Sequence, residues 1–270
     1  MNLAVPQAEV DVAPSRPARG KAETGTLDLA LRILEFLAQQ PQPVALTAIA
    51  RTFDASKATV YRHLQGLMRQ GFVRRDQNSR YAVGIKLMVL GEQCRSQFEI
   101  VGVARDELLK LRDRTGQAIS ICALIEEDLV VLDLVHGRTL VEFTTRPGTR
   151  LDLHASAHGK IWLAFGPEGL LKRVLAGTRK SWTPHTITDP KALAAEVAAV
   201  KKRGWATAPN QTAMGVNTLA APVYDHRRVL VGSIAIVGST QVLAAKPSEQ
   251  QLDDVLATAQ RISRALGFKE

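Results

Sequence analysis

Residues 46–81 constrain this chain more than any other segment, because they combine two short helical patterns, a tight connection and a basic hairpin. Apolar residues recur at helical spacing over residues 47–53, and a polar pair then breaks the pattern. Ser56 suits the N-cap of a second helix, and Gly71 suits its left-handed C-terminal position. The pattern afterwards alternates with period two around a polar turn at residues 76–79. The segment therefore predicts a helix-turn-helix followed by a two-stranded wing.

The second predicted helix separates an apolar side from a polar side. Five apolar residues at helical spacing are expected to face the core: Ala58, Val60, Leu64, Leu67 and Met68. The positions between them are mostly polar and would face outward. Between residues 51 and 86, eight basic residues stand against two acidic ones, about six of the nine net positive charges of the chain.

A basic helix pair of this kind suits double-stranded DNA. Positive side chains neutralise phosphates, and side chains near the start of the second helix read base edges. The alternative is a solvated basic face without a partner. The expected DNA contacts are Arg51, Ser56, Lys57, Thr59, Tyr61, Arg62, Arg74, Arg75 and Arg80. The last three belong to the wing and would contact the DNA backbone.

The chain is too long for this unit alone. Its 270 residues suggest two domains, and 46% hydrophobic with 23% charged residues is typical of a soluble globular protein. No apolar run approaches the roughly 20 residues of a membrane span, so we expect no membrane domain. The first residues lack the pattern of a secretory signal, which favours a cytoplasmic location. Cys94 and Cys122 are too few for a disulfide framework or a cysteine-based zinc site.

Residues 1–23 are predicted to form a disordered basic arm, because Pro, Ala and charged residues dominate them. The arm carries Arg16, Arg19 and Lys21. These cations would either reach a neighbouring minor groove or belong to a solvated tail.

Two further helical patterns flank the predicted DNA-binding segment. Residues 26–38 place an apolar stripe on one side, which would pack under the helix pair: Leu27, Ala30, Leu31, Leu34 and Leu37. Residues 98–114 form an amphipathic pattern that we interpret as a linking helix. Such a connector favours a dimer seam, and a two-fold protein matches a pseudo-palindromic DNA site. Packing of this helix within its own chain is the alternative.

From residue 117 onward the sequence predicts an α+β domain with an antiparallel sheet, a natural container for a small ligand. Runs of strand-like residues enclose grouped helical patterns. The expected strands are 118–125, 129–135, 140–145, 205–207, 218–224 and 229–237, and the expected helices are 156–165, 168–176, 190–203 and 248–266.

Several motifs together resemble the IclR-type bacterial transcription regulators. They are LDLALRILEFLA, SKATVYRHLQGLMRQGFVRRD with RYAVG, LDLHASAHGKIWLAF, TPHTITDP, KKRGWA and MGVNTLAAPVYD, in this order. The resemblance runs from Thr26 to the C-terminus. It implies a winged helix-turn-helix, a linker helix and a C-terminal GAF/profilin-like effector-binding domain, in homodimers that often pair into tetramers. The expected boundaries are 24–90, 91–115 and 116–270.

The same resemblance implies an effector pocket between the turn before the HASAHGK helix and the strands around MGVNTLAAPV. The carried-over pocket residues are Ala157, His158, Ala208, Val216, Thr218 and Ala235. Backbone N–H groups at a helix start bind anions, so a small organic acid is expected. Many relatives have acidic residues where this chain has Ala208 to Gln211, and some have a serine at position 235. The loss of polar groups favours an aromatic acid, since fewer groups would be left unpaired around it.

The sequence contains no complete catalytic motif of the enzyme classes that we considered. Gly159-Lys160 lacks the first glycine of a phosphate loop and the Ser or Thr that binds magnesium. His154 and His158 lack the glutamate of a metalloprotease motif, and Ser156 has no evident orienting carboxylate. We therefore expect no catalytic residue, no metal and no cofactor. A ligand-responsive regulator of a catabolic operon is favoured over two alternatives: an architectural DNA-binding protein whose C-terminal domain only oligomerises, and an enzyme fused to a DNA-binding unit.

Overall fold

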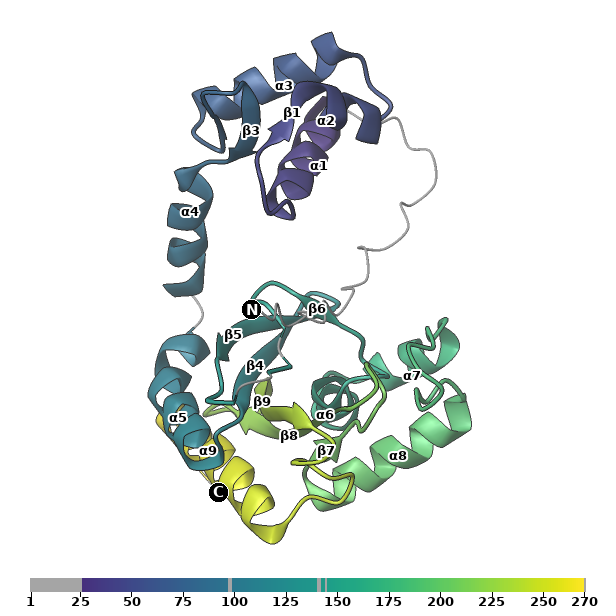
Figure 1. Cartoon of the computed structure of the whole chain (residues 1–270). Helices are drawn as coiled ribbons and strands as arrows, with labels where there is room; N and C mark the ends of the chain where they lie inside the picture. Colours follow the sequence, from purple (N-terminus) through teal and green to yellow (C-terminus); the bar gives the residue numbers. More distant parts are fainter. Residues whose placement is uncertain (1–25, 97–98, 140–141, 144, 270) are drawn as a thin grey trace, which may run out of the picture. The chain divides into compact units, whose positions relative to one another are not determined.

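The computed structural model describes residues 26–96, 99–139, 142–143 and 145–269. They form two compact units, which meet in sequence at residues 97 and 98 and are described separately (Figure 1). The predicted basic arm, with Arg16, Arg19 and Lys21, lies outside the described residues. No helix in the described ranges is both long and apolar enough to cross a membrane.

In its described residues, the N-terminal unit contains four helices and a small antiparallel sheet with the strand order β1-β3-β2. Its elements are α1 (Thr26–Ala38), β1 (Val44–Ala45), α2 (Leu46–Thr52), α3 (Lys57–Arg69), β2 (Val73–Arg75), β3 (Arg80–Val83) and α4 (Ile85–Ser96). The helix-turn-helix and the wing are therefore confirmed. The wing has a third strand that was not predicted, because β1 is only two residues long and shows no periodicity.

Side-chain caps and turn residues define the borders of these elements. The Ser56 hydroxyl accepts a hydrogen bond from the Thr59 N–H over 3.1 Å and so caps α3. Gly71 has a φ of +78°, the left-handed conformation expected after this helix. In the wing turn, the Asp76 carboxylate accepts the backbone N–H groups of Asn78 and Arg80. These two hydrogen bonds to Asp76 fix the backbone conformation of the turn.

The core of this unit differs from the predicted helix faces in two places. Ile33 and Leu37 of α1 are buried, whereas Leu27 is 71% exposed and Leu31 is also exposed. The expected stripe was wrong there because Asp28, Arg32 and Glu35 leave an apolar surface on α1 that is wider than the core covers, so the pattern alone does not select which part is buried. On α3, Ala58 is exposed although it was expected in the core.

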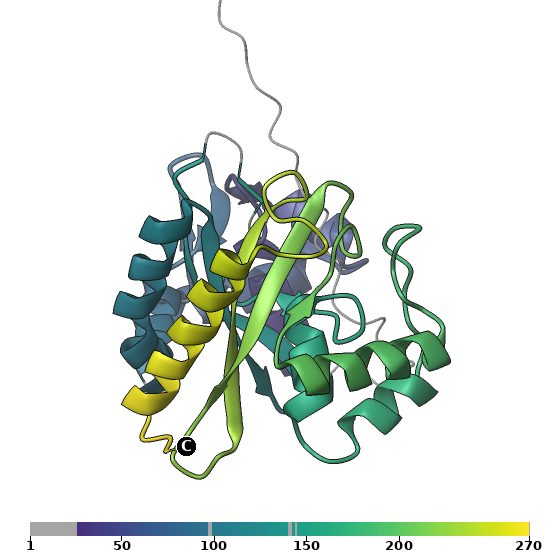
Figure 2. The same ribbon diagram turned by 90° about the horizontal axis from the view of Figure 1, so that it is seen from below.

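The C-terminal unit is an antiparallel sheet with the order β6-β5-β4-β9-β8-β7, covered by helices on both faces. Helices α5 and α9 lie side by side on one face, as the view from below shows, and α6 packs on the other with α8 behind it (Figures 1 and 2). The elements are α5 (Glu99–Thr115), β4 (Ala118–Ile125), β5 (Asp128–Val135), β6 (Arg150–Leu151), α6 (Ala157–Phe165), α7 (Leu170–Ala176), α8 (Pro190–Arg203), β7 (Ala206–Thr207), β8 (Val216–Tyr224), β9 (Leu230–Ser239) and α9 (Glu249–Ala265). The α+β class is confirmed. The strand expected at 140–145 is not found at positions 142, 143 and 145, and its other positions lie outside the described residues.

The two faces of the sheet carry side chains of different size. Large residues of the central strands, such as Ile121 and Ile234, pack towards α5 and α9. The alternate residues are small and face α6, with Ser120 paired to Ala235 and Cys122 paired to Ser233. Small side chains let a helix approach the sheet closely. A larger side chain at one of these small positions would therefore crowd α6.

The predicted linking helix is divided between the two units. The segment 91–115 contains the end of α4, which belongs to the first unit, and α5, which belongs to the second. The apolar side of α5 is buried against α9 in the same chain. Ion pairs reinforce this contact, with Arg114 Nε 2.7 Å from an Asp254 carboxylate oxygen and Arg261 bonded to Glu107. The apolar side of α5 therefore packs within its own chain, and a dimer seam on this helix stays a prediction.

Candidate nucleic-acid interface and candidate effector site

The exposed side of α3 begins at its capped N-terminus. Lys57 and Arg62 are exposed, and so is the Tyr61 ring between them in sequence. The hydroxyls of Ser56 and Thr59 lie 2.9 Å apart and are hydrogen-bonded to each other, with Thr59 half-buried. Residues spaced three or four apart share one side of a helix. The first two turns of α3 therefore present two cations and several hydrogen-bonding groups to solvent.

The wing and α2 add further cations. Arg51, Arg74, Arg75 and Arg80 are all exposed, and the Arg75 guanidinium lies 5.8 Å from the centre of the Tyr81 ring. None of the eight basic residues between positions 51 and 86 forms an ion pair with a residue that the structure describes. The cations of this segment are thus not neutralised by ion pairs with described residues. Such a surface can bind phosphates and present donors to base edges.

The candidate effector site is built around the start of α6. The Ser156 hydroxyl accepts the Gly159 N–H over 3.0 Å and donates to the Asp152 carbonyl. Ala157 and His158 are the first two helical residues, so their N–H groups have no partner within the helix. Two N–H groups and the helix dipole together favour an anion at this end of α6.

His158 is 2% exposed and bridges two strands of the sheet. Its Nε2 is hydrogen-bonded to the Ser120 hydroxyl over 2.9 Å, and its Nδ1 is hydrogen-bonded to the Ser233 hydroxyl over 2.8 Å. Burial lowers the pKa of His158 to about 3, so the ring is neutral near pH 7. The imidazole therefore fastens α6 to β4 and β9. Ser233 was not among the predicted residues, although its position two residues before Ala235 places both on the same face of β9.

Acid should destabilise the C-terminal unit through His158. The folded protein keeps the ring neutral to about pH 3, whereas the unfolded chain takes up a proton near pH 6.5. The stabilisation is therefore complete above pH 6.5 and is lost as the pH falls towards 3. When the pH falls from 7 to 4.5, the unfolding free energy of the wild type should therefore decrease by about 2 to 3 kcal/mol more than that of His158→Gln. Urea denaturation at both pH values measures this difference. The exposed His226→Gln variant is the control, and an equal loss in both variants would contradict the assignment.

The other predicted effector residues surround the same helix in part. Ala157, Ala208 and Ala235 are buried in one apolar cluster, whereas Val216 is buried at the start of β8 outside it. Thr218 is half-buried and pairs with Val237 of β9. The structure thus brings three of the six residues into one cluster with His158 adjacent to it. No signal in a single sequence distinguishes these alanines from ordinary core residues.

A buried lysine holds α6 next to the strand that precedes Ala208. Lys160 is almost fully buried, and its Nζ donates to the Thr207 carbonyl over 2.7 Å. The nearest Glu196 carboxylate oxygen lies 3.6 Å away and belongs to α8. Burial lowers the pKa of Lys160 to about 8. The interaction links the end of β7 to the helix that carries the candidate anion site.

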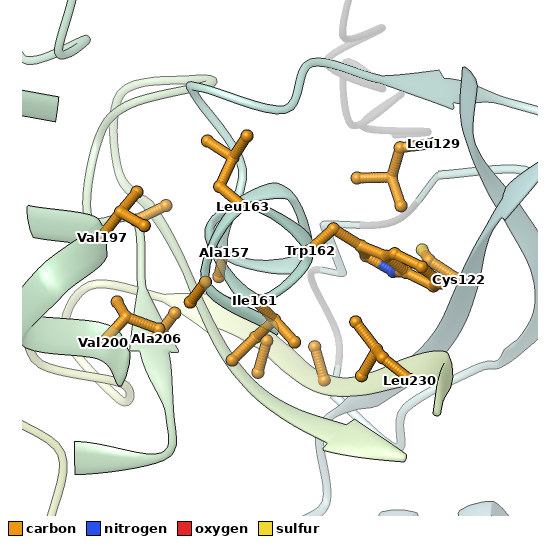
Figure 3. Packing of buried hydrophobic residues seen from close by; sticks show 14 of the residues in the cluster. Cys122, Leu129, Ala157, Ile161, Trp162, Leu163, Val197, Val200, Ala206 and Leu230 are labelled. Carbon is orange, nitrogen blue, oxygen red and sulfur yellow. The ribbon is translucent and has the colours of Figure 1, made fainter. Parts of the chain in front are cut away.

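Two buried polar atoms near this region have no hydrogen-bond partner in the described part of the chain: the indole nitrogen of Trp162 and the side-chain oxygen of Gln211. Figure 3 shows Trp162 pointing from α6 towards Cys122, beside Leu129. Trp162 is therefore a core residue of this unit. The residue types gathered around it are apolar, which suits a flat ring better than a polar ligand.

Comparison with known proteins identifies both units. The family model for the bacterial transcriptional regulator IclR C-terminal domain matches residues 93–264, and the model for the IclR helix-turn-helix domain matches residues 26–77. Relatives that share this family are transcription regulators and not enzymes, which agrees with the lack of a catalytic motif.

Individual relatives match almost the whole chain. The glycerol operon regulatory protein of Streptomyces griseus is 30% identical over 245 residues, which cover 90% of this chain and 96% of the relative. The crystal structure of Thermotoga maritima IclR has a TM-score of 0.78 at 32% identity and covers 90% of this chain and 99% of that one. An IclR homologue from Microbacterium hydrocarbonoxydans, complexed with 4-hydroxybenzoate, has a TM-score of 0.80 at 21% identity, covering 90% and 99%, and shows the common fold. This chain therefore belongs to the IclR family of DNA-binding bacterial transcriptional regulators.

Proposed function

We propose that this regulator responds to a small organic acid, which binds at the N-terminus of α6 and changes the affinity of the protein for its operator. The observation that carries the proposal is the capped start of α6, where two N–H groups have no partner within the helix and Ala157 packs in one apolar cluster with Ala208 and Ala235. His158 is neutral, and both of its ring nitrogens are hydrogen-bonded to serine hydroxyls. Backbone N–H groups and the helix dipole would therefore stabilise the negative charge of the acid.

An aromatic acid suits this site best. The predicted effector residues offer methyl and isopropyl groups, the Thr218 hydroxyl and the neutral imidazole of His158, and none of them carries a charge near pH 7. A polar keto acid would leave its oxygens unpaired there, whereas an aromatic ring would not. The Microbacterium homologue was crystallised with 4-hydroxybenzoate, an acid of this class. The regulated genes would then be a catabolic operon for such acids, read in the cytoplasm, where bacterial DNA lies.

DNA recognition is assigned to the exposed side of α3 and to the wing. Lys57, Thr59, Tyr61 and Arg62 would lie near bases or phosphates at the start of the recognition helix. Arg51 and the three wing arginines would contact the backbone, with Ser56 holding the start of α3. All of these side chains except the half-buried Thr59 are exposed, and the cations among them have no ion-pair partner in the described residues, which supports this assignment.

A homodimer on a pseudo-palindromic operator completes the proposal, and we place its contact on α4 and α1 rather than on α5. The apolar residues of α4 and the first turns of α1 are exposed, whereas the apolar side of α5 is already buried: Leu27, Leu31, Ile85, Met88, Val89 and Leu90 are the exposed set. Pairs of such dimers would form tetramers. The effector would act by binding one of two states of the dimer more tightly than the other.

A binding experiment tests the effector. Affinity of the full chain for its own upstream DNA is measured at several salt concentrations with no acid, with benzoate, with 4-hydroxybenzoate and with pyruvate. We expect the aromatic acids to change the affinity at least five-fold, a coupling of about 1 kcal/mol, and pyruvate to change it less. Ala235→Leu should abolish the response, because the larger side chain crowds the buried contact between β9 and α6.

The control for that variant is Ala195→Leu on the exposed side of α8. If no acid changes DNA affinity, the alternative of an architectural DNA-binding protein gains its main support. If pyruvate acts and the aromatic acids do not, the class of effector is wrong while the response itself stands.

A further inference from the structure

One exposed methyl group interrupts the polar side of α3. Ala58 is the second residue of the helix and faces solvent. Tyr61 and Arg62 follow at spacings of three and four, so their side chains neighbour Ala58 on the same side. Lys57 stands directly before it. The start of the helix thus carries a small apolar spot, formed by the Ala58 methyl and the Tyr61 ring, between two cations that form no ion pair in the described unit.

A methyl group at this place has a specific counterpart in DNA. Thymine is the only ordinary base with a methyl group in the major groove, and alanine is among the side chains that contact it. Arginine recognises guanine through two parallel hydrogen bonds. A side chain no larger than Ala58 also lets the helix approach the base edges closely. Phosphates, in contrast, gain nothing from an exposed alanine, so its chemistry points to bases.

We propose that Ala58 is a specificity-determining residue that contacts the methyl group of a thymine in each operator half-site, beside a guanine contacted by Arg62. This inference rests on the proposed role of α3 as the base-reading helix. It goes beyond that role because it states which bases the half-site contains and which side chain distinguishes thymine from cytosine at one position.

Removal of single methyl groups from the DNA tests the contact. Each thymine of the protein's own operator is replaced in turn by deoxyuridine, which lacks only the methyl, and the affinity of the full chain is measured. We expect one position in each half-site at which the wild type binds about four-fold more weakly, the effect of one methyl removed from an apolar contact. Ala58→Gly should bind the thymine and deoxyuridine duplexes equally at that position.

Control variants separate the possible failures. Ala195→Gly removes the same methyl from an exposed helical position of α8 and should keep the four-fold difference. Ala58→Ser replaces the methyl without the flexibility of glycine and should lose the difference as well, which shows that helix fraying is not the cause.

Two results would overturn the proposal. If the thymine preference is the same in the wild type and in Ala58→Gly, or if no thymine methyl matters, Ala58 does not contact thymine. Arg62→Ala tests the underlying role of α3, with an expected loss of about 5- to 150-fold. If that loss occurs and the methyl effect does not depend on Ala58, α3 still reads the operator. If Arg62→Ala binds like the wild type, the assignment of α3 fails together with the inference.

Discussion

Gly159→Ala is expected to destabilise the C-terminal unit by roughly 3 kcal/mol or more, because no space exists for the added methyl. A Cβ at this position would lie 2.3 Å from the Leu153 carbonyl oxygen and 2.5 Å from the Leu153 Cα. Both are backbone atoms, so relief requires the segment before α6 to move. Chemical denaturation followed by tryptophan fluorescence measures the loss, since Trp162, Trp182 and Trp205 all belong to this unit.

The matched control is another glycine inside a helix of the same unit. An added Cβ at Gly102 of α5 has nothing within 4 Å. Gly102→Ala should therefore stabilise the protein by about 0.5 to 1 kcal/mol, through the lower helix propensity of glycine. An unfolding free energy of Gly159→Ala within about 0.5 kcal/mol of the wild type would show that the loop before α6 moves freely. Such freedom would also contradict a preformed anion site at Ala157 and His158.

Local signals in the sequence identified the elements of the DNA-binding unit well. The caps and turns depend on residues next to each other, such as Ser56 with Thr59 and Asp76 with Asn78, so a single sequence contains the information. The faces of α1 and of the start of α3 were predicted less well. Ala58 has a side chain too small for burial to be inferred from its type, and the apolar surface of α1 is wider than the part that the core covers.

The candidate effector site was harder to predict for a physical reason. Its residues come from α6, β4, β8 and β9, and contact between them depends on strand register rather than on local pattern. The family resemblance supplied Ala157, His158 and Ala235, but it supplied neither Ser120 nor Ser233. The register pairs Ser120 with Ala235, which places Ser120 and Ser233 on the same face of neighbouring strands. His158 can therefore be hydrogen-bonded to both.

Met88→Glu is expected to weaken operator binding by about a hundred-fold or more, by separating the two DNA-binding units of the proposed dimer. The Met88 side chain is 70% exposed on α4, beside the other exposed apolar residues of that helix. A carboxylate at the centre of an apolar contact would lose its hydration without gaining a partner. A dimer binds its second half-site at a high effective concentration, which is worth 10² to 10⁴ in affinity and disappears in a monomer. Analytical ultracentrifugation and operator titration measure both effects.

Met214→Glu is the matched control, because Met214 is 58% exposed in a loop of the C-terminal unit. That variant should remain a dimer and bind the operator within about two-fold of the wild type. On DNA with a single half-site, wild type and Met88→Glu should bind alike, since the α3 surface is unchanged and only the second half-site was lost. A Met88→Glu protein that still sediments as a dimer would exclude α4 from the seam. If it sediments as a monomer but keeps full operator affinity, the two half-sites do not act together, and recognition of a pseudo-palindrome by paired units is the part of the proposal that fails.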